Sequence, residues 1–459
     1  MSIFKACDIR GRYGEELCDE HACRLGLALA EYCGTTDVVI GGDGRTSTPA
    51  LLAHLASALT VTGCRVVNLG IVPTPALYFA RRQLGISVGV MVTASHNPAA
   101  DNGFKLSLGA LPVTPDDIVA LAHIMNSVPA DRVQSVLRAH APPAGQRRVD
   151  ILPDYTDYAR SQSKPLNGMR VIVDCANGAA SRVARHVWEQ TGARVSYLFD
   201  DVDGTFPNHA PDPSNSANLS ALCKQVVSQN ADLGIAYDGD GDRVVFVDHL
   251  GRPLSGDRAI VLFAREALRA GPAPVVYDQK CSLIVPEAIR SAGGEPIIER
   301  SGHTFIKTAF LKNSAPYAGE ISGHHFFRKL QGDDGVIASL YMAGLLQDSG
   351  STLAELADAI EVYPITPDIR LKMDSSTANR VLDNLERRLA GEARFVKLDG
   401  LRAEFADGWG IARLSVTEPA MTFRFEGRDK AALVRVIQRF EHAAPDLQGR
   451  LPDTAALPV

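Results

Sequence analysis

Three aspartates alternate with glycines in the stretch Asp238-Gly239-Asp240-Gly241-Asp242-Arg243. Carboxylates this close together repel one another, so they require a cation or water between them. Several hard oxygen donors in one loop suit Mg²⁺ or Ca²⁺. The stretch does not fit an EF-hand, because an apolar strand rather than a helix is predicted directly after it, at 244–247. The alternative to a metal site is a solvated acidic turn.

A serine stands at the end of a second predicted strand. The apolar run 86–92 leads into Thr93-Ala94-Ser95-His96-Asn97-Pro98. A hydroxyl at a strand end is well placed to act as a nucleophile or to carry a phosphoryl group. The alternative is an ordinary turn with a polar tip. The nearby Gly85-Ile86-Ser87-Val88-Gly89 matches the G-x-S-x-G pattern of hydrolases, but Ser87 falls in the strand run instead of on the sharp turn that this pattern needs.

Two further loops carry side chains that suit a phosphorylated sugar. Two guanidinium groups and two hydroxyls that can bind a phosphate occur in Arg413-Leu414-Ser415-Val416-Thr417-Glu418-Pro419 together with Arg424. The alternative for this loop is a surface turn with a salt bridge. A glutamate and a serine flanked by glycines, which suit sugar hydroxyls, occur in Gly319-Glu320-Ile321-Ser322-Gly323-His324-His325. The adjacent histidines do not predict zinc, because no Cys or further His lies at ligand spacing.

The elements that must position these loops alternate along the chain. Thr48 and Pro49 suit an N-cap and a first helical position before a predicted helix, and 65–69 reads as a strand. Such alternation predicts an α/β protein with mainly parallel sheets. Apolar strands run into Gly- or Asp-bearing loops at 38–45, 88–98, 171–178, 233–243, 275–280 and 316–324. Because ligands of open α/β sheets bind beyond the carboxyl ends of the strands, we expect these loops to converge on one cleft.

Composition limits the classes of function. The chain has 459 residues, 46% of them apolar, and at about 150 residues per domain this predicts two to four domains. The net charge of −6 argues against a general nucleic-acid binder. We expect no membrane segment, because no apolar run reaches about 18 residues and the N-terminus lacks the apolar stretch of a signal peptide. The eight cysteines form no C-x-x-C pair, so we expect reduced thiols and a cytoplasmic location. Linkers are predicted at 141–146 and 362–367.

Together the loops resemble the α-D-phosphohexomutase superfamily, and within it the bacterial phosphomannomutase/phosphoglucomutase group. Asp8-Ile9-Arg10-Gly11 is similar to its N-terminal signature, and the other motifs follow in the family's order over nearly the whole chain. The resemblance implies three related α/β domains with mixed, mainly parallel sheets, and a smaller C-terminal α+β domain like the TATA-binding protein, around a central cleft. The implied domains are 1–145, 146–248, 249–361 and 362–459, the last of them mobile.

The resemblance also implies roles for individual residues. Ser95 would be the phosphorylated serine, and Mg²⁺ would be held by a phosphate oxygen on Ser95 and by Asp238, Asp240 and Asp242. Lys105 matches a lysine proposed as general base, with a purely electrostatic role as the alternative. Other catalytic positions lining the cleft would be Arg10, Arg243, Lys280 and His303. Glu320 and Ser322 would read the 3- and 4-hydroxyls of the sugar, in a loop that includes His324. The phosphate that does not react would be held by Arg413, Ser415, Thr417 and Arg424.

The implied activity is reversible phosphoryl transfer between the 1- and 6-positions of mannose or glucose phosphate, through phosphoserine and a hexose 1,6-bisphosphate. A phosphoglucosamine mutase is the nearest alternative, although that group usually has Gln where this chain has Ile321. A metal-dependent phosphatase and a non-catalytic sugar-phosphate sensor are further alternatives. Intact Ser95 and intact aspartates argue against the sensor. The chain is expected to act on a small molecule, as a monomer or a dimer.

Two positions depart from the family pattern. Cys7 stands where many relatives have Tyr, and Val416 stands where they usually have Asn. Each change removes a side-chain hydrogen bond, which typically contributes about 1 kcal/mol. Neither change removes a catalytic group, so we expect them to affect specificity and affinity only.

Overall fold

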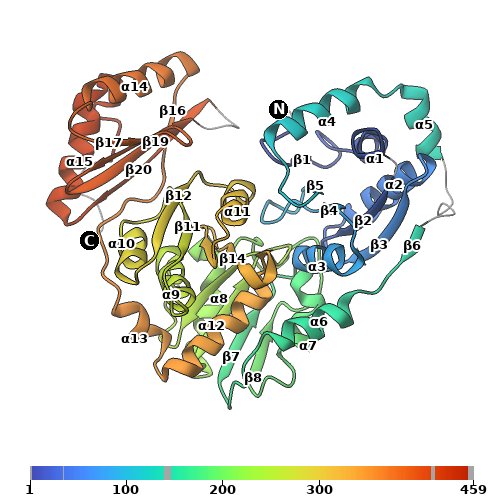
Figure 1. Cartoon of the computed structure of the whole chain (residues 1–459), viewed down its shortest axis with the longest axis horizontal. Coiled ribbons are helices and arrows are strands. Elements are labelled where there is room, and N and C mark those ends of the chain that lie inside the picture. Colours follow the sequence, from blue (N-terminus) through green and yellow to red (C-terminus); the bar gives the residue numbers. More distant parts are fainter. Residues whose placement is uncertain (1–2, 35, 139–145, 415–418, 453–459) are drawn as a thin grey trace.

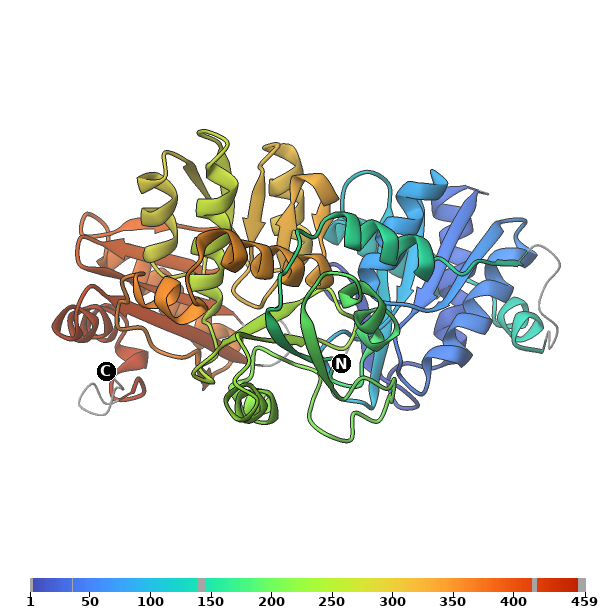
Figure 2. The same cartoon turned by 90° about the horizontal axis from the view of Figure 1, so that it is seen from below.

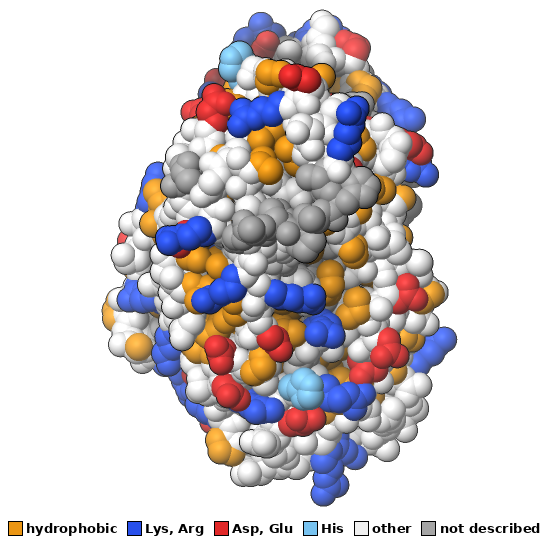
Figure 3. Space-filling model, turned by 90° about the vertical axis from the view of Figure 1, so that its right-hand side faces the viewer, with side chains coloured by type: hydrophobic (Ala, Val, Ile, Leu, Met, Phe, Trp, Pro, Cys, Tyr) orange, Lys and Arg blue, Asp and Glu red, His pale blue; other side chains and the backbone are white. Residues whose placement is uncertain are grey.

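The computed structural model describes residues 3–34, 36–138, 146–414 and 419–452, which form four units. The units follow one another around an arc, with the N-terminal and C-terminal units at its two ends (Figures 1 and 2). Within the described part of the chain, no helix combines the length and the apolar character that crossing a membrane requires. On the side of the first unit, Lys and Arg side chains are interspersed with Asp and Glu (Figure 3), in keeping with 47 basic and 53 acidic residues.

The first unit is built on a mixed six-stranded sheet of order β1-β5-β4-β2-β3-β6. β2 runs parallel to β3 and β4, whereas β5 is antiparallel to β1 and β4. Its strands are β1 (Ile9–Arg12), β2 (Asp37–Gly42), β3 (Arg65–Ile71), β4 (Val88–Val92), β5 (Asp101–Leu108) and β6 (Gln146–Arg148). Its helices are α1 (Asp19–Cys33), α2 (Thr48–Val61), α3 (Thr74–Leu84), α4 (Pro115–Ser127) and α5 (Ala130–Arg138).

The second unit has a four-stranded sheet of order β10-β9-β7-β8, parallel except for the hairpin of β9 and β10. Its strands are β7 (Arg170–Asp174), β8 (Arg194–Leu198), β9 (Leu233–Tyr237) and β10 (Val244–Asp248). Helix α6 packs against α3 of the first unit as well as against α7. The helices are α6 (Leu152–Ser161), α7 (Ala184–Trp188) and α8 (Ser220–Ser228), with 3₁₀ turns at Ala179–Arg182 and Ser216–Leu219.

The third unit has a five-stranded sheet of order β12-β11-β13-β14-β15, in which β11 is parallel to β12 and β13 and the remaining pairs are antiparallel. Its strands are β11 (Pro274–Asp278), β12 (Glu295–Glu299), β13 (Tyr317–Gly319), β14 (His325–Phe327) and β15 (Gly332–Asp333). Helix α12 also contacts β9 and β10 of the second sheet. The helices are α9 (Gly256–Leu268), α10 (Ile284–Ser291), α11 (His303–Lys312), α12 (Gly335–Ser349) and α13 (Leu353–Asp358), with a 3₁₀ turn at Arg328–Leu330.

The fourth unit is smaller and has a fully antiparallel sheet of order β16-β20-β19-β18-β17. The strands are β16 (Ile369–Lys372), β17 (Arg394–Val396), β18 (Leu401–Phe405), β19 (Gly408–Leu414) and β20 (Ala420–Gly427). The helices are α14 (Ser375–Arg388) and α15 (Lys430–Ala443), followed by a 3₁₀ turn at Pro445–Leu447. The buried residues of α15 include Leu433, Val436, Ile437 and Phe440, whose spacing places them on one face of the helix.

Hydrophobic packing divides the molecule differently from the sheets. One continuous buried cluster joins Val39 of the first unit, Val173 of the second and Val275 of the third. The fourth unit has a separate core, which includes Phe423 and Phe440. Apolar burial therefore ties the first three units together more firmly than it ties the fourth unit to them.

The predicted fold class is confirmed: three α/β units with mixed sheets precede a smaller antiparallel unit. One local prediction is wrong, because Ser47 and not Thr48 is the N-cap of α2. The linker predicted at 141–146 lies outside the described residues except for Gln146, which opens β6 and pairs within the first sheet. The four domain boundaries stay predictions.

Candidate active site

Ser95 lies in the loop between β4 and β5, at the end of the strand from which it was expected to project. Its side chain is almost fully buried, and its φ of +51° lies in the left-handed region that residues with a side chain rarely adopt. The Oγ atom donates a hydrogen bond of 2.8 Å to Asp238 Oδ2. The backbone N–H donates to Thr93 Oγ1 at 2.8 Å. The hydroxyl therefore faces the acidic loop of the second unit from a fixed backbone.

The acidic loop joins β9 to β10. The carboxylates of Asp238, Asp240 and Asp242 are fully buried, and one oxygen from each lies within 4.8 Å of the others. Gly239 allows this loop to approach the serine loop, because a Cβ atom there would lie 2.5 Å from Ser95 O. The sequence prediction that the two loops meet is therefore matched by their positions.

Lys105 of β5 lies beside the same carboxylates. Its Nζ atom is 2.9 Å from Asp240 Oδ2 and also forms an ion pair with Asp242. Burial lowers the pKa of the ammonium, but the attraction of Asp240 and Asp242 outweighs burial and raises it well above its ordinary value. This arrangement favours the charged form of Lys105.

The carboxylate cluster fits a divalent cation. Among the described residues, the buried atoms Asp240 Oδ1 and Asp242 Oδ1 have no hydrogen-bond partner. Burial, followed by repulsion from Asp240 and Asp242, raises the pKa of Asp238 well above its usual range. Buried, crowded carboxylates with free oxygens are the hard donor set that Mg²⁺ prefers. Asp238, Asp240 and Asp242 are the residues that would hold it.

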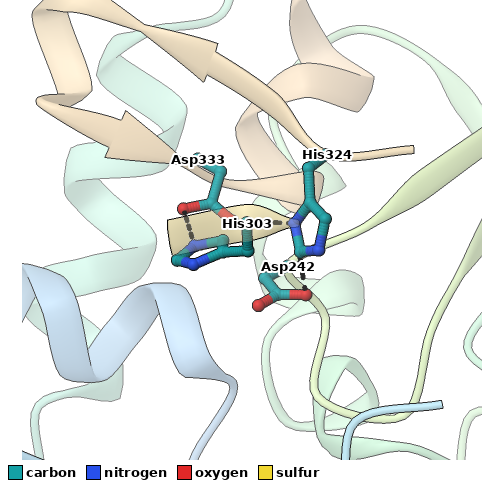
Figure 4. A group of neighbouring side chains, drawn as sticks. All are labelled: Asp242, His303, His324 and Asp333. Carbon is teal, nitrogen blue, oxygen red and sulfur yellow. Dashed lines mark hydrogen bonds and ion pairs between the residues drawn. The ribbon is translucent and has the colours of Figure 1, made fainter. Parts of the chain in front are cut away.

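A second group of acidic and imidazole side chains shares Asp242 with the first (Figure 4). Asp333 of β15 bridges His303 Nε2 and His324 Nδ1, each at 2.9 Å. Arg243 Nε donates to His324 Nε2 at 2.9 Å. Because an arginine Nε only donates, His324 Nε2 accepts and the proton of its neutral ring lies on Nδ1, facing Asp333. Both ring nitrogens of His324 are thus occupied by hydrogen bonds. The group of Asp242, His303, His324 and Asp333 therefore forms a hydrogen-bond network rather than a second metal site.

The hairpin of β13 and β14 carries the predicted sugar loop. Ser322 Oγ donates to Glu320 Oε1 at 2.8 Å. Glu320 Oε2 is buried and has no partner among the described residues. Arg243 and His324 form an isolated bridge between this hairpin and the acidic loop. The free carboxylate oxygen can therefore accept a hydrogen bond from a ligand hydroxyl close to the network of Arg243.

Most of the predicted site residues form one group around the serine and acidic loops, and the remainder contact the fourth unit or belong to it. Arg10 Nη1 donates to Ala94 O of the serine loop at 3.3 Å, and this group also includes Ser95, Lys105, Asp238, Asp240, Asp242, Arg243, His303, Glu320, Ser322 and His324. Lys280, at the end of β11, pairs instead with Asp368 at 2.6 Å. Arg413 pairs with Asp399 at 2.7 Å, and Arg424 lies in the neighbouring strand β20. The predicted phosphate-binding residues Ser415 and Thr417, and the departure at Val416, lie outside the described residues.

Sequence reasoning missed several side chains of the site. Asp333 was not singled out, although Gly332-Asp333-Asp334-Gly335 has the same mixture of acidic residues and glycines as the metal loop. Thr74 Oγ1 donates to Asp240 Oδ2 at 2.5 Å across 166 residues of sequence, and nothing in the local pattern indicates this contact. His96 Nδ1 lies 3.4 Å from Ser95 Oγ. Arg243 and burial lower the pKa of His96 to about 2, which leaves its ring neutral.

Comparison with known proteins agrees with this arrangement. Sequence models described as phosphoglucomutase/phosphomannomutase alpha/beta/alpha domains I, II and III match residues 1–131, 153–251 and 255–363, and the model of the C-terminal domain matches 367–443. The chain belongs to the phosphoglucomutase/phosphomannomutase family. It is therefore an enzyme of an isomerase family.

Relatives of this family member match it over nearly the whole length. A phosphomannomutase/phosphoglucomutase from Pseudomonas aeruginosa is 36% identical over 98% of this chain and 97% of its own. A phosphoglucomutase from Neisseria meningitidis is 36% identical over 96% of each chain. The crystal structure of a phosphoglucomutase/phosphomannomutase family protein from Burkholderia thailandensis has a TM-score of 0.86 at 33% identity and covers 98% of each chain. A structure of N-acetylphosphoglucosamine mutase from Aspergillus fumigatus with GlcNAc-6P and magnesium has a TM-score of 0.63 at 17% identity over 96% and 95% of the chains, a likeness of fold alone.

Proposed function

We propose that this family member transfers a phosphoryl group reversibly between the 1- and 6-positions of a hexose phosphate, with mannose and glucose phosphates as substrates. Ser95 carries the phosphoryl group, and a hexose 1,6-bisphosphate is the intermediate. The observation that carries the proposal is the hydrogen bond of 2.8 Å from Ser95 Oγ to Asp238, inside a buried carboxylate cluster. The names of the relatives at 36% identity support the substrate class.

The two half-reactions mirror each other. In the first, the P–O bond to Ser95 Oγ breaks and phosphorus bonds to the free hydroxyl of the sugar monophosphate. That hydroxyl loses its proton to a base, and Lys105 is the candidate that the family resemblance names. Because Lys105 lies as an ammonium between Asp240 and Asp242, it must first lose a proton to act as this base. Ser95 Oγ takes up a proton as it leaves. In the second half-reaction Ser95 Oγ gives up this proton and bonds to the phosphorus at the opposite end of the bisphosphate, and the sugar oxygen released there takes up a proton.

Positive charge around Ser95 supports this transfer. Phosphoryl transfer depends mainly on positioning and on electrostatic stabilisation. Asp238, Asp240 and Asp242 would hold Mg²⁺, which would supply further stabilisation of the charge on the transferring group. Arg243, held by His324, and Arg10, at the serine loop, add guanidinium groups that both act on His96, the neighbour of Ser95. The magnesium in the fungal mutase structure supports the choice of metal.

The sugar is oriented by contacts to groups other than its reacting hydroxyl. Glu320 and Ser322 bind the 3- and 4-hydroxyls, which glucose and mannose present alike, so one site accepts both. The phosphate that does not react is held by the fourth unit, through Arg413, Ser415, Thr417 and Arg424. Because either end of the sugar must be able to face Ser95, the intermediate turns over between the half-reactions. The fourth unit then opens and closes about the segment 362–367.

The test follows the phosphoryl group on the enzyme. Exposure to a hexose 1,6-bisphosphate should add about 80 Da to the peptide that contains Ser95, as measured by intact and peptide mass. Ser95→Ala should abolish both the added mass and turnover of mannose 1-phosphate. Ser87→Ala is the matched control, because this exposed serine lies only eight residues away. Wild-type turnover by Ser95→Ala contradicts the proposal, release of free phosphate favours a phosphatase, and faster turnover of glucosamine 6-phosphate favours the phosphoglucosamine mutase.

A further inference from the structure

Arg45, at the turn between β2 and α2, is a fully buried arginine whose guanidinium group is completely hydrogen-bonded. Nη2 donates to Ser95 O at 2.8 Å and to Asn97 O at 2.7 Å. Nη1 donates to Pro98 O at 2.5 Å and to Asp101 O at 2.9 Å. Nε donates to Asp43 Oδ2 at 3.0 Å. All five N–H donors are used, three of them on carbonyls of the serine loop and one on the carbonyl of Asp101, the first residue of β5.

Asp43 holds the other side of the same loop. Its Oδ2 atom accepts a hydrogen bond of 2.7 Å from Thr93 Oγ1, and that hydroxyl accepts the N–H of Ser95 at 2.8 Å. Its Oδ1 atom accepts from Thr48 Oγ1 at 2.9 Å. The pair Asp43–Arg45 therefore fixes both the amide and the carbonyl of Ser95, on either side of its unusual φ.

The second unit covers this turn. The guanidinium of Arg45 lies 5.2 Å from the centre of the Phe206 ring. The backbones of the two units also approach closely here, because a Cβ atom on Gly204 would lie 2.4 Å from Gly44 O. The loop that carries Phe206 belongs to the same unit as the three aspartates. The turn of Arg45 therefore links the serine loop to the unit that holds the metal-binding carboxylates.

We propose that the Asp43–Arg45 pair positions the serine for phosphoryl transfer, with Arg45 as its central positioning residue. This inference rests on the proposed function. Arg45 contacts neither the hydroxyl nor the carboxylates of the metal loop, so it acts through the backbone. Its role requires a planar group with five donors, which the three donors of a lysine ammonium cannot replace. A reacting atom displaced by about 1 Å can slow a reaction by about 10²-fold.

The test compares Arg45→Lys with a variant that lowers the stability of the first unit at a position away from the serine loop. Leu29→Ala removes a buried side chain from the core of the first unit without touching the serine loop. We expect Arg45→Lys to lower kcat by about 10²-fold with little change in KM. The rate at which Ser95 gains about 80 Da from a hexose 1,6-bisphosphate should fall by the same factor. Deuterium exchange should rise in the peptide 93–101 of Arg45→Lys and stay at the wild-type level in Leu29→Ala.

Three results would overturn the proposal: wild-type kcat in Arg45→Lys, an effect confined to KM, or an equal loss of kcat in Leu29→Ala at matched melting temperature. If Arg45→Lys does not fold, Thr93→Val tests the same pair by removing the hydroxyl between Ser95 and Asp43, and wild-type kcat in that variant overturns it. The wild-type protein separates the two proposals. If its Ser95 gains no mass, the proposed function fails. Equal phosphorylation of wild type and Arg45→Lys defeats only this inference.

Discussion

The conformation of Ser95 is unfavourable by itself and is stabilised by its neighbours. A left-handed backbone at a residue with a side chain costs about 1 kcal/mol or more. Two hydrogen bonds offset this cost and hold the residue in place: the N–H of Ser95 donates to Thr93, and Arg45 donates to the C=O of Ser95. Strained residues that their surroundings hold so firmly often occur where a reacting atom must be placed accurately.

Variants of Lys105 can distinguish an electrostatic role of this residue from a role as general base. Lys105→Met removes both roles, and we expect kcat to fall by about 10²-fold because a preorganised charge is lost beside the transferring group. Lys105→Arg keeps the charge but cannot act as a base, since an arginine is not deprotonated in proteins. Because Asp240 and Asp242 raise the pKa of Lys105, we expect the arginine variant to retain most of the wild-type kcat.

Steady-state turnover of mannose 1-phosphate by the three proteins decides between the two roles. An arginine variant as slow as the methionine variant would contradict the electrostatic role and support the general base. The pH dependence of kcat is the second readout, because only the base role requires that Lys105 itself titrate.

At the level of residues, the sequence predicts the groups that stand in recognisable motifs. Residue type and spacing indicate Ser95 and the three aspartates as functional groups, and the structure brings them together. Arg45 and Thr74 carry no such signal, because their partners Ser95 and Asp240 lie 50 and 166 residues away in the sequence. Such long-range hydrogen bonds depend on tertiary packing, which the local pattern of the sequence does not encode.

The hairpins and the loops at strand ends are the elements that bring the site together. The serine loop follows β4, the acidic loop joins β9 to β10, and the sugar loop joins β13 to β14. The prediction that loops of this kind converge rests on the common direction of parallel strands. The register of β6 and the packing of α12 on the second sheet could not be predicted, because they depend on contacts between segments that lie far apart in the sequence.

The close approach of two of these loops depends on Gly239. In Gly239→Ala the new Cβ would lie 2.5 Å from Ser95 O and 3.3 Å from Pro211 Cβ, so the serine and acidic loops must move apart. We expect kcat to fall by about 10-fold to 10²-fold, because the reacting oxygen is displaced from the carboxylates. The rate of Ser95 phosphorylation, followed by mass, should fall with it.

Gly344→Ala is the matched control for this substitution. Gly344 lies within α12, and the nearest neighbour of an added Cβ is Lys164 Cδ at 4.0 Å. Alanine also favours the helix, so the control should be as active as the wild type and slightly more stable. Equal activities of Gly239→Ala and Gly344→Ala would show that the spacing of the loops does not limit the reaction.

In the whole molecule, the fourth unit is attached to the third mainly through polar contacts. Arg402 is fully buried, and its guanidinium donates to the carbonyls of Gln279 and Cys281. Lys280 pairs with Asp368. Since the fourth unit has its own core, these contacts can break without exposing the core of either unit. This is the arrangement that an opening and closing fourth unit requires.

We expect Glu426 to make this attachment dependent on pH. The carboxyl group of Glu426 accepts hydrogen bonds from Ser282, from the N–H of Leu283 and from Trp409. Burial nevertheless raises its pKa from 4.5 to about 7. The folded protein therefore keeps a proton that the unfolded chain loses between pH 4.5 and 7. The free energy of unfolding contributed by Glu426 is largest below pH 4.5 and falls as the pH rises to 7.

Glu426→Gln removes this titration while its amide preserves the acceptor toward Leu283 and Trp409 and offers a donor to Ser282. Between pH 5 and pH 8 we expect the wild type to lose on the order of 2 kcal/mol more unfolding free energy than Glu426→Gln. Urea unfolding monitored by tryptophan fluorescence measures this difference, because Trp409 contacts Glu426 directly. Glu392→Gln, an exposed position of the same unit, should follow the wild type at both pH values. If Glu426→Gln also follows the wild type at both, then the proton on Glu426 does not stabilise the attachment of the fourth unit.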